Sequence, residues 1–338
     1  MRISIDTFNR GRDLDAAAAL LAGRQKRDRA REPLLPARYE DPAACRELVA
    51  AELDEERAVG VIARAEGEPV GFMVMTANLF HPTSMVAGFF PSRPASIGYA
   101  GHAAREDVAF DATRAMYAAL ADDFVRRGFF DHLVYIAPRD PVLNEAWASL
   151  GFGRALTAAI RGVEPVAGEG APGIEVHAAA AEDAEVIFAL NDELSVHHSR
   201  APIFMPLLRE AEAGSHEFQR SLLAEPEANP HFVAYRDGVP VAMNTFMAPG
   251  WISRLIAPEK TIYLYQGVVS EDARGGGVGT AVLKAGIDWA RSQGYEHVAL
   301  HFASANIPGA RFWQGQGFRP VEHRYVRHID ERIAWARE

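Results

Sequence analysis

A glycine-rich segment in the second half of the chain has the residue types of an anion-binding loop. Arg274-Gly275-Gly276-Gly277-Val278-Gly279 follows a run of β-branched and aromatic residues at 261–269 and precedes helical spacing over 278–292. Glycine adopts backbone angles that other residues avoid and lets a ligand approach the main chain. Free N–H groups and the dipole of the following helix favour a negative charge there. The hydroxyl of Thr280 adds a further donor in the first turn.

Two common nucleotide-binding patterns do not fit this loop. The Walker pattern requires Gly-Lys-Ser/Thr after four spacers, and the loop contains no lysine. The dinucleotide pattern requires glycines at i, i+2 and i+5, but the third position is Thr280 when counted from Gly275 and Val282 when counted from Gly277. The anion is therefore not expected to be bound in either of these ways.

The spacing Arg-x-x-Gly-x-Gly after the Val268-Val269 strand end instead resembles the pyrophosphate loop of the GNAT superfamily of acyltransferases. A second segment contains Asn306, the aromatic pair Phe312-Trp313 and a closing Gly317-Phe318, and it resembles the second motif of that superfamily. The two motifs lie at a family-like separation, and the resemblance covers about residues 174–330. It implies that this half binds acetyl-CoA as a co-substrate.

The resemblance also implies a role for individual residues. The backbone of Val268 and Val269 would hydrogen-bond the pantetheine arm, and the loop from Arg274 to Thr280 would cradle the pyrophosphate. Asn306 would face the arm near the thioester, and Phe312 and Trp313 would wall its far side. The expected cofactor-binding set is Val268, Val269, Arg274, Gly275, Gly276, Gly277, Val278, Gly279, Thr280, Asn306, Phe312 and Trp313.

The residues expected to move protons depart from the family pattern. The usual acid is a tyrosine where this chain has Trp313, and an indole N–H cannot protonate a thiolate at neutral pH. Where many members place a glutamate or histidine base, this chain has Tyr263 and Tyr265, and a phenol is a weak base near pH 7. Water, His301 on the following strand and a residue of the first lobe remain as alternatives for proton transfer, and an ordinary structural histidine is the alternative interpretation of His301.

The chain contains an internal repeat. At an offset of 166 residues, six positions match in one register: Tyr99 with Tyr265, Gly101 with Gly267, Gly128 with Gly294, Trp147 with Trp313, Gly151 with Gly317, and Phe152 with Phe318. Further upstream the offset is 171, where Ile3 meets Ile174 and Pro69-Val70 meets Pro240-Val241. Repeats of this kind indicate related structural units.

The repeat and a Gly-, Pro- and Ala-rich segment predict a domain organisation. We expect a first domain at 1–163, a linker at 164–173 and an acetyl-CoA-binding catalytic domain at 174–338. Strand and helix patterns alternate in both halves. Together with the resemblance, they imply an α/β (α+β) fold of two tandem GNAT-like lobes, each with a mixed, mainly antiparallel central sheet flanked by helices.

The first domain lacks the features of the loop. In the 166-residue register, residues 274–279 correspond to 108–113, where every glycine has been replaced and Phe110 and Asp111 would obstruct and repel a pyrophosphate. We therefore expect a degenerate first lobe that does not bind CoA there and has a structural or substrate-shaping role. This two-lobe arrangement resembles that of the mycothiol synthase family. The insertion from Leu79 to Tyr99 would either line a cleft between the lobes or serve as structural filler.

Composition limits the remaining possibilities. The chain has 338 residues and a net charge of −10, which disfavours a general nucleic-acid binder. No apolar run is long enough to span a membrane, and the N-terminus does not read as a signal peptide, so we expect a cytoplasmic protein without a membrane partner. Cys45 is the only cysteine, and His197, His198 and His216 have no ligand partners at a useful spacing, so no metal is expected.

The leading hypothesis is an N-acetyltransferase that transfers the acetyl group of acetyl-CoA directly to a small amine, as a monomer or homodimer. Two alternatives remain open at this point: acylation of a protein or peptide N-terminus, and a non-catalytic acyl-CoA sensor.

Overall fold

The computed structural model describes residues 2–168, 170–206 and 208–336. The ends of the predicted domains at Met1 and Glu338, and Glu169 of the predicted linker, lie outside these ranges. Among the described residues, no helix is long and apolar enough to cross a membrane.

The first half of the chain forms seven strands and four α-helices in its described part. In chain order they are β1 (Ile3–Thr7), α1 (Arg10–Arg31), α2 (Pro42–Asp54), β2 (Ala58–Ala65), β3 (Glu68–Ala77), β4 (Pro94–Ile97), β5 (His102–Ala104), α3 (Ala109–Arg126), β6 (Asp131–Ile136), α4 (Pro141–Ser149) and β7 (Gly153–Gly162). Side-chain caps define several helix starts: Asn9 accepts from the Arg12 N–H at α1, and Asp140 accepts from the N–H groups of Val142 and Leu143 at α4.

The second half repeats this order, except that one strand, β11, stands where the first half has β4 and β5. Its elements are β8 (Ile174–Ala178), α5 (Ala184–Ser199), α6 (Arg209–Leu223), β9 (His231–Arg236), β10 (Val239–Met247), β11 (Thr261–Val269), α7 (Val278–Ser292), β12 (His297–Ala303), α8 (Ile307–Gly315) and β13 (Arg319–His328). The repeat predicted from sequence has structural counterparts, because Gly128 and Gly294 follow α3 and α7, and Gly151 and Gly317 follow α4 and α8, all with positive φ.

One continuous sheet joins the two halves. Its strand order is β1-β2-β3-β4-β6-β13-β7-β12-β11-β10-β9-β8, with β5 paired to β3. Most strand pairs are antiparallel, and the helices flank the sheet, which confirms the predicted fold class. We call β1–β6 with α1–α4 the first lobe, and β8–β12 with α5–α8 the second lobe.

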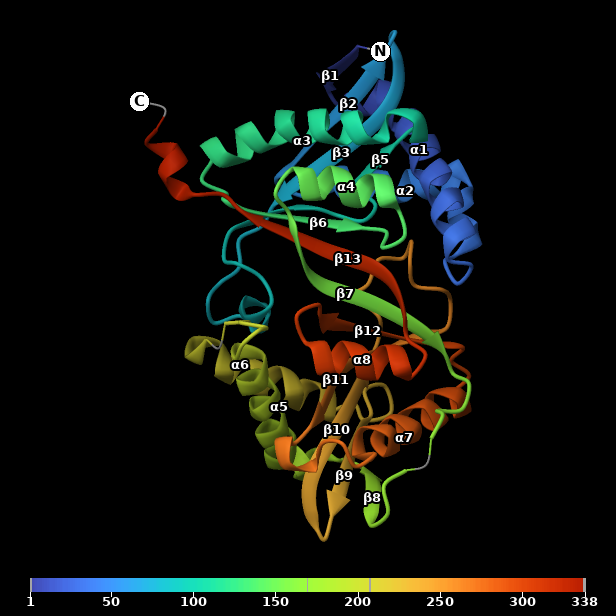
Figure 1. Ribbon diagram of the computed structural model, residues 1–338, viewed down its shortest axis with the longest axis vertical. Helices are drawn as coiled ribbons and strands as arrows, with labels where there is room; N and C mark the ends of the chain where they lie inside the picture. Colours follow the sequence, from blue (N-terminus) through green and yellow to red (C-terminus); the bar gives the residue numbers. More distant parts are fainter. Residues whose placement is uncertain (1, 169, 207, 337–338) are drawn as a thin grey trace.

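The two lobes exchange their last strands. The last strand of the first half, β7, pairs with β12 of the second lobe, whereas the last strand of the chain, β13, pairs with β6 of the first lobe. These two strands also pair with each other, and they cross the middle of the molecule side by side (Figure 1). The C-terminus consequently returns to the end of the molecule that carries the N-terminus (Figure 1). The division into sequence domains at 164–173 stays a prediction, since the spatial halves do not follow it strictly.

Buried apolar residues hold the lobes together. One core cluster combines Leu14 and Leu21 of α1 with Ala158 of β7, Tyr263 of β11 and Val321 of β13. Burial of apolar side chains is the main stabilising contribution to folding. The relative position of the lobes is therefore maintained by a shared core in addition to the sheet.

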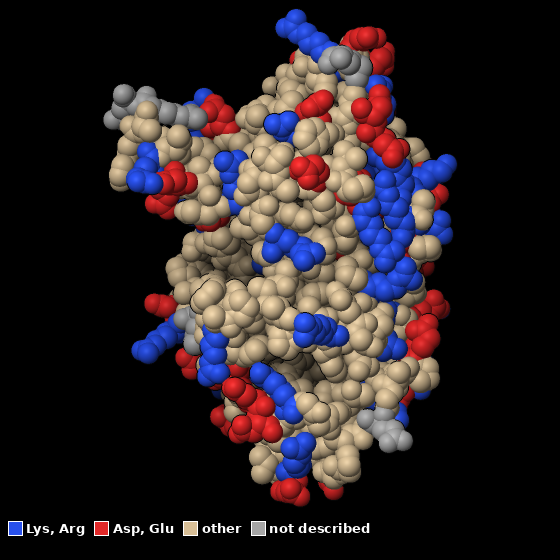
Figure 2. All heavy atoms as spheres, in the orientation of Figure 1, with Lys and Arg blue, Asp and Glu red and all other residues tan. Residues whose placement is uncertain are grey.

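Charged side chains are present on the surface of both lobes (Figure 2). In the view of Figure 2, Lys and Arg side chains gather in a band over α1 and α2, whereas acidic groups are dispersed over both ends. The net charge of −10 therefore does not produce a single acidic face in this view.

Candidate active site

The glycine-rich loop forms a turn directly before α7. Gly275 and Gly277 have φ values of 81° and 80°, in the left-handed region that favours glycine, and Gly277 is the N-cap of α7 without a capping side chain. The N–H groups of the first turn are thus free to bind a ligand. Arg274 is held across the start of the turn, because its Nε donates to the carbonyl oxygen of Val269 at 3.0 Å.

Strands β11 and β12 separate beside this loop. They pair in parallel only from Thr261/His297 to Leu264/Leu300, although β11 continues to Val269 and β12 to Ala303. A register shift between β10 and β11 leaves Tyr265 as an extra residue on β11. From Tyr265 onward, β10 is the only described strand that pairs with β11, so one backbone edge of Gln266–Val269 is open.

A cavity of about 820 Å³ runs from the loop, past the open strand edge, to the region between the lobes. It brings together all three predicted catalytic residues and all but one of the predicted cofactor-binding residues. Those lining it are Tyr263, Tyr265, His301, Val268, Val269, Arg274, Gly275, Gly277, Val278, Gly279, Thr280, Asn306, Phe312 and Trp313. Gly276 is outside the lining, and a Cβ on it would lie 3.4 Å from Arg236 Nη2.

Two glycines make room for the aromatic pair of α8. A Cβ on Gly267 would lie 2.8 Å from Cη2 of Trp313, and a Cβ on Gly279 would lie 3.2 Å from Cζ of Phe312. The side-chain Nδ2 of Asn244, which is directly across from Gly267 on β10, lines the same cavity and has no hydrogen-bond partner among the described residues. A narrow slot with a free amide donor fits the amide-bearing arm that the resemblance predicts.

Asn306 has a structural role beside its predicted one. Its side chain caps α8 by accepting from the Gly309 N–H at 3.1 Å, and it also lines the cavity. His197 at the end of α5 lies nearby. Burial, followed by the charge of Arg274, lowers the pKa of His197, while a hydrogen bond with Asn306 opposes that shift.

His301 belongs to a polar chain that reaches into the shared core. Its Nδ1 is 2.8 Å from the Tyr263 hydroxyl, and its Nε2 is 3.8 Å from Oε1 of the buried Glu322. His301 and Glu322 are both in register with Ala158 of β7, on either side of it. Residues directly across a sheet share a face, and the small side chain of Ala158 lets the other two approach over it.

The two predicted tyrosines are poor bases as isolated groups. Burial raises the pKa of Tyr263 far above its usual value, and burial likewise raises the pKa of Tyr265. Neither phenol ionises at neutral pH in this environment. A role for Tyr263 in proton transfer therefore depends on the imidazole bonded to its hydroxyl.

The first lobe contributes to the same cavity. Met85, Gly88, Phe89 and Phe90 of the insertion between β3 and β4 line it, as does Tyr135 of β6. Phe89 packs edge-on against Trp251, with 6.4 Å between ring centroids. Of the two interpretations of the Leu79–Tyr99 insertion, its central part thus fits the cleft-lining one.

The structure groups three residues that the sequence spacing did not connect. Oxygens of Asp192 and Glu212 and a ring nitrogen of His216 lie within 4.8 Å of one another, and His216 Nε2 is 3.0 Å from Asp192 Oδ1. Asp192 is on α5 and the other two are on α6, a helix that the sequence patterns did not indicate. The hydrogen bond accounts for the position of His216, which also stacks on Phe188 at 4.5 Å.

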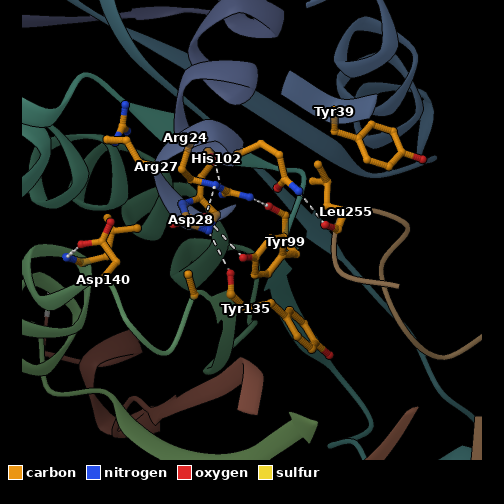
Figure 3. A network of polar contacts seen from close by, with 12 residues as sticks. Arg24, Arg27, Asp28, Tyr39, Tyr99, His102, Tyr135, Asp140 and Leu255 are labelled. Atoms are coloured by element: carbon orange, nitrogen blue, oxygen red, sulfur yellow. Dashed lines mark hydrogen bonds and ion pairs between the residues drawn. The ribbon is translucent and has the colours of Figure 1, made fainter. Parts of the chain in front are cut away.

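The equivalent region of the first lobe is filled. Residues 108–113 form the start of α3, which begins at Ala109 without a glycine turn. Figure 3 shows Arg24 of α1 pointing toward Tyr99 and His102, and its guanidinium donates to the carbonyl oxygens of both residues. A cavity of only about 10 Å³ lies beside Asp28, which is too small for a ligand.

Comparisons with known proteins agree with this architecture. Residues 195–318 match the sequence model of the family described as "Acetyltransferase (GNAT) family". A comparison with curated protein sequences finds no match.

Solved structures similar to the chain extend the likeness to both lobes. A GCN5-related N-acetyltransferase from Sphaerobacter thermophilus has a TM-score of 0.59 and 15% identity, covering 96% of this chain and 94% of that one. A tandem GNAT protein from the clavulanic acid biosynthesis pathway has a TM-score of 0.52 and 14% identity, covering 97% and 98%. A glucosamine N-acetyltransferase region of a fungal multi-domain β-N-acetylglucosaminidase has a TM-score of 0.54 and 11% identity, covering 96% and 38%. Residues 195–318 thus resemble the GNAT acetyltransferase family in sequence, and the chain as a whole is similar in fold to a tandem GNAT protein.

Proposed function

We propose that the second lobe binds acetyl-CoA and transfers its acetyl group to the amine of a small molecule. The observation that carries this proposal is the single cavity, because it joins the glycine loop before α7 to a chamber between the lobes. The cavity volume of about 820 Å³ lies within the range typical of small-molecule sites. It therefore supports a small acceptor over the N-terminus of a protein.

The residues of the loop and slot would hold the cofactor. Backbone N–H groups from Gly275 to Gly279 and the dipole of α7 favour the pyrophosphate. The open edge of β11 offers backbone groups to the pantetheine arm, and Phe312 and Trp313 cover it from α8. When bound, acetyl-CoA supplies the activated acetyl thioester.

The Tyr263–His301–Glu322 chain would remove the proton that the attacking amine loses. The amine proton passes to Oη of Tyr263 while the hydroxyl proton passes to Nδ1 of His301, so the tyrosine never has to exist as a free phenolate. The nearby carboxylate of Glu322 stabilises the imidazolium that results. The indole of Trp313 has no acidic proton for the leaving thiolate, which leaves as the anion and is protonated by solvent.

A thiol-release assay with acetyl-CoA against a panel of diverse small amines tests the function. We expect CoA release with at least one amine for the wild-type protein. Binding of acetyl-CoA without release from any amine or peptide would identify a sensor instead. Release with peptide N-termini alone would show that the acceptor is a protein.

The proton path has a separate test. We expect His301→Ala and Tyr263→Phe to lower kcat by about 10²-fold or more, in the range of general acid–base contributions, and to change the pH–rate profile. Ala158→Val would insert methyl groups between His301 and Glu322 and so produce part of the same change. An unchanged pH–rate profile in His301→Ala would exclude this role.

A further inference from the structure

Arg324 is a buried cation at the end of the cavity that lies between the lobes. Arg324 is 8% exposed and lines the cavity from β13, one of the two exchanged strands. Ala303, Leu156, Arg324 and Tyr135 follow one another across four neighbouring strands, and all four line the cavity. On their strands, Ala303, Leu156 and Arg324 each lie two positions from His301, Ala158 and Glu322, respectively. Residues two apart on a strand share a face of the sheet. Arg324 thus adjoins the proposed reaction centre.

The surroundings of Arg324 supply an aromatic ring and a phenol. The guanidinium carbon lies 4.8 Å from the centroid of Phe90, a residue of the first-lobe insertion. Tyr135 is a second neighbour: burial raises the pKa of its phenol, and the charge of Arg324 opposes that shift. Phe90 and Tyr135 both orient the guanidinium, but neither side chain carries a negative charge at neutral pH.

The guanidinium of Arg324 has no ion-pair partner in the described part of the chain. No described carboxylate forms an ion pair with Arg324, and its Nε has no hydrogen-bond partner. The nearest acid along the strand, Glu322, lies with its Oε1 3.8 Å from His301. A buried guanidinium left unpaired is costly, whereas Nε and a terminal nitrogen together bind an oxyanion through two parallel hydrogen bonds.

We infer that Arg324 binds an anionic group of the acyl acceptor, so that the acceptor is a small molecule carrying both an amine and a carboxylate or phosphate. This inference rests on the proposed function, and it narrows the acceptor from small amines in general to anionic ones. It also gives the degenerate lobe a task, because Phe90 and Tyr135 position the guanidinium from the first-lobe side.

Matched pairs of acceptors test this inference in the thiol-release assay. L-Phenylalanine against phenethylamine tests a carboxylate, and O-phosphoethanolamine against ethanolamine tests a phosphate. We expect one anionic member to exceed its neutral partner in kcat/KM by at least about tenfold, as for a hydrogen bond to a charged group. Equal turnover within both pairs would overturn the inference while leaving the acetyltransferase proposal in place.

Variants of Arg324 show whether this residue makes the distinction. Arg324→Gln should raise KM for the anionic acceptor and abolish the preference without changing KM for acetyl-CoA, and Arg324→Lys should restore part of the preference. Arg114→Gln is the matched control, because Arg114 also stacks on a phenylalanine, Phe110 at 5.0 Å, but lies on α3 away from the cavity. A preference that persists in Arg324→Gln would overturn the assignment.

A binding measurement covers the case in which no acceptor of the panel releases thiol. N-Acetyl-L-phenylalanine and inorganic phosphate are titrated calorimetrically into the CoA-saturated protein. Binding of either anion that Arg324→Gln and Arg324→Lys weaken in graded order supports the anion site even if the proposed reaction fails. Absence of binding by both anions, together with absence of turnover, would count against both proposals.

Discussion

The two lobes place the same residue types at equivalent positions and use them differently. Trp147 on α4 is fully buried and packs edge-on against Tyr117 and Phe152, at centroid distances of 5.4 and 4.9 Å. Its counterpart Trp313 on α8 is partly exposed and lines the cavity. The tryptophan of α4 therefore belongs to the core of the first lobe, whereas the tryptophan of α8 forms a wall of the open slot in the second lobe.

The strand beside each tryptophan explains this difference. In the second lobe β11 is one strand with an open edge, but in the first lobe the equivalent chain is broken into β4 and β5 around Tyr99. His102, in register with Val268 in the repeat, reaches across the gap and has its Nε2 2.9 Å from the carbonyl oxygen of Tyr135. Burial lowers the pKa of His102 to about 3, so it bridges the strands as a neutral ring. In the first lobe a side chain thus bridges the position at which the second lobe has an open strand edge.

The largest expected effect comes from placing a carboxylate in the loop. Gly277→Asp should weaken acetyl-CoA binding by about 10²-fold or more, because like charges at about 4 Å repel by about 4 kcal/mol at an effective dielectric of 20. Gly67→Asp is the matched control, since Gly67 also has a positive φ, 89°, and a Cβ added there would have no neighbour within 4 Å, but it lies in a hairpin of the first lobe. Equal CoA affinity in the two variants, measured by calorimetry, would contradict the assignment of the loop.

The tryptophan pair should separate stability from binding. Trp147→Ala should lower the free energy of unfolding by about 3–5 kcal/mol, as expected when a buried aromatic residue is deleted. Trp313→Ala should cost less stability and instead raise KM for acetyl-CoA. Urea unfolding and steady-state kinetics of both variants check this prediction, which fails if the two tryptophans affect the same quantity.

The glycine pair Gly101 and Gly267 sharpens the comparison with a single methyl group. A Cβ at Gly267 meets the rigid indole of Trp313, so Gly267→Ala should lower kcat/KM for acetyl-CoA by roughly tenfold, the effect of about 1.4 kcal/mol. At Gly101 a Cβ meets Glu52 Oε2 and the Gly98 backbone at 3.2 Å, so Gly101→Ala should lower the melting temperature instead. If Gly267→Ala keeps full activity, the slot does not hold the reacting arm.

The smallest expected effect is a pH dependence specific to the first lobe. Burial, followed by the charge of Glu55, raises the pKa of Glu52 from 4.5 to about 7. The folded state thus favours the neutral acid, which contributes stability below pH 4.5 that is lost as the pH rises to about 7. Glu52→Gln should remove this slope and stabilise the protein at pH 8 by on the order of 1 kcal/mol, since the residue is only half-buried. Chemical unfolding of both proteins from pH 4 to pH 8 measures the difference, and parallel profiles would contradict it.

Local patterns were sufficient to predict the loop and most of the second lobe. The bounds of β11 and α7 follow from β-branched spacing, the glycine turn and helical periodicity, which are properties of neighbouring residues. Glu322 and Arg324 were missed because their value to the site depends on which strands flank β13. Each of β7 and β13 has two similar candidate partners, β6 and β12, which lie far apart in the sequence. Because the repeat makes these strands nearly equivalent, the sequence does not show that β7 pairs with β12 and β13 with β6.

The absence of α6 from the prediction has a different cause. Arg209–Leu223 carries a glycine and several polar residues, and its apolar face is narrow. It is stabilised by packing on α5 and on the first-lobe insertion, where a Cβ on Gly214 would lie 2.7 Å from the Thr83 carbonyl oxygen. Tertiary contact thus outweighs a weak local preference.

The exchanged strands impose an order on synthesis. While the ribosome is still making the second half, β6 has no β13 to pair with, and it exposes a row of unsatisfied backbone groups. The first lobe can close only after Arg319–His328 has left the ribosomal tunnel, so neither lobe can complete folding as an independent unit during translation. Loss of the last strand by truncation would accordingly damage the half of the molecule that was made first, and a first lobe joined in this way cannot be deleted without opening the sheet of the second lobe.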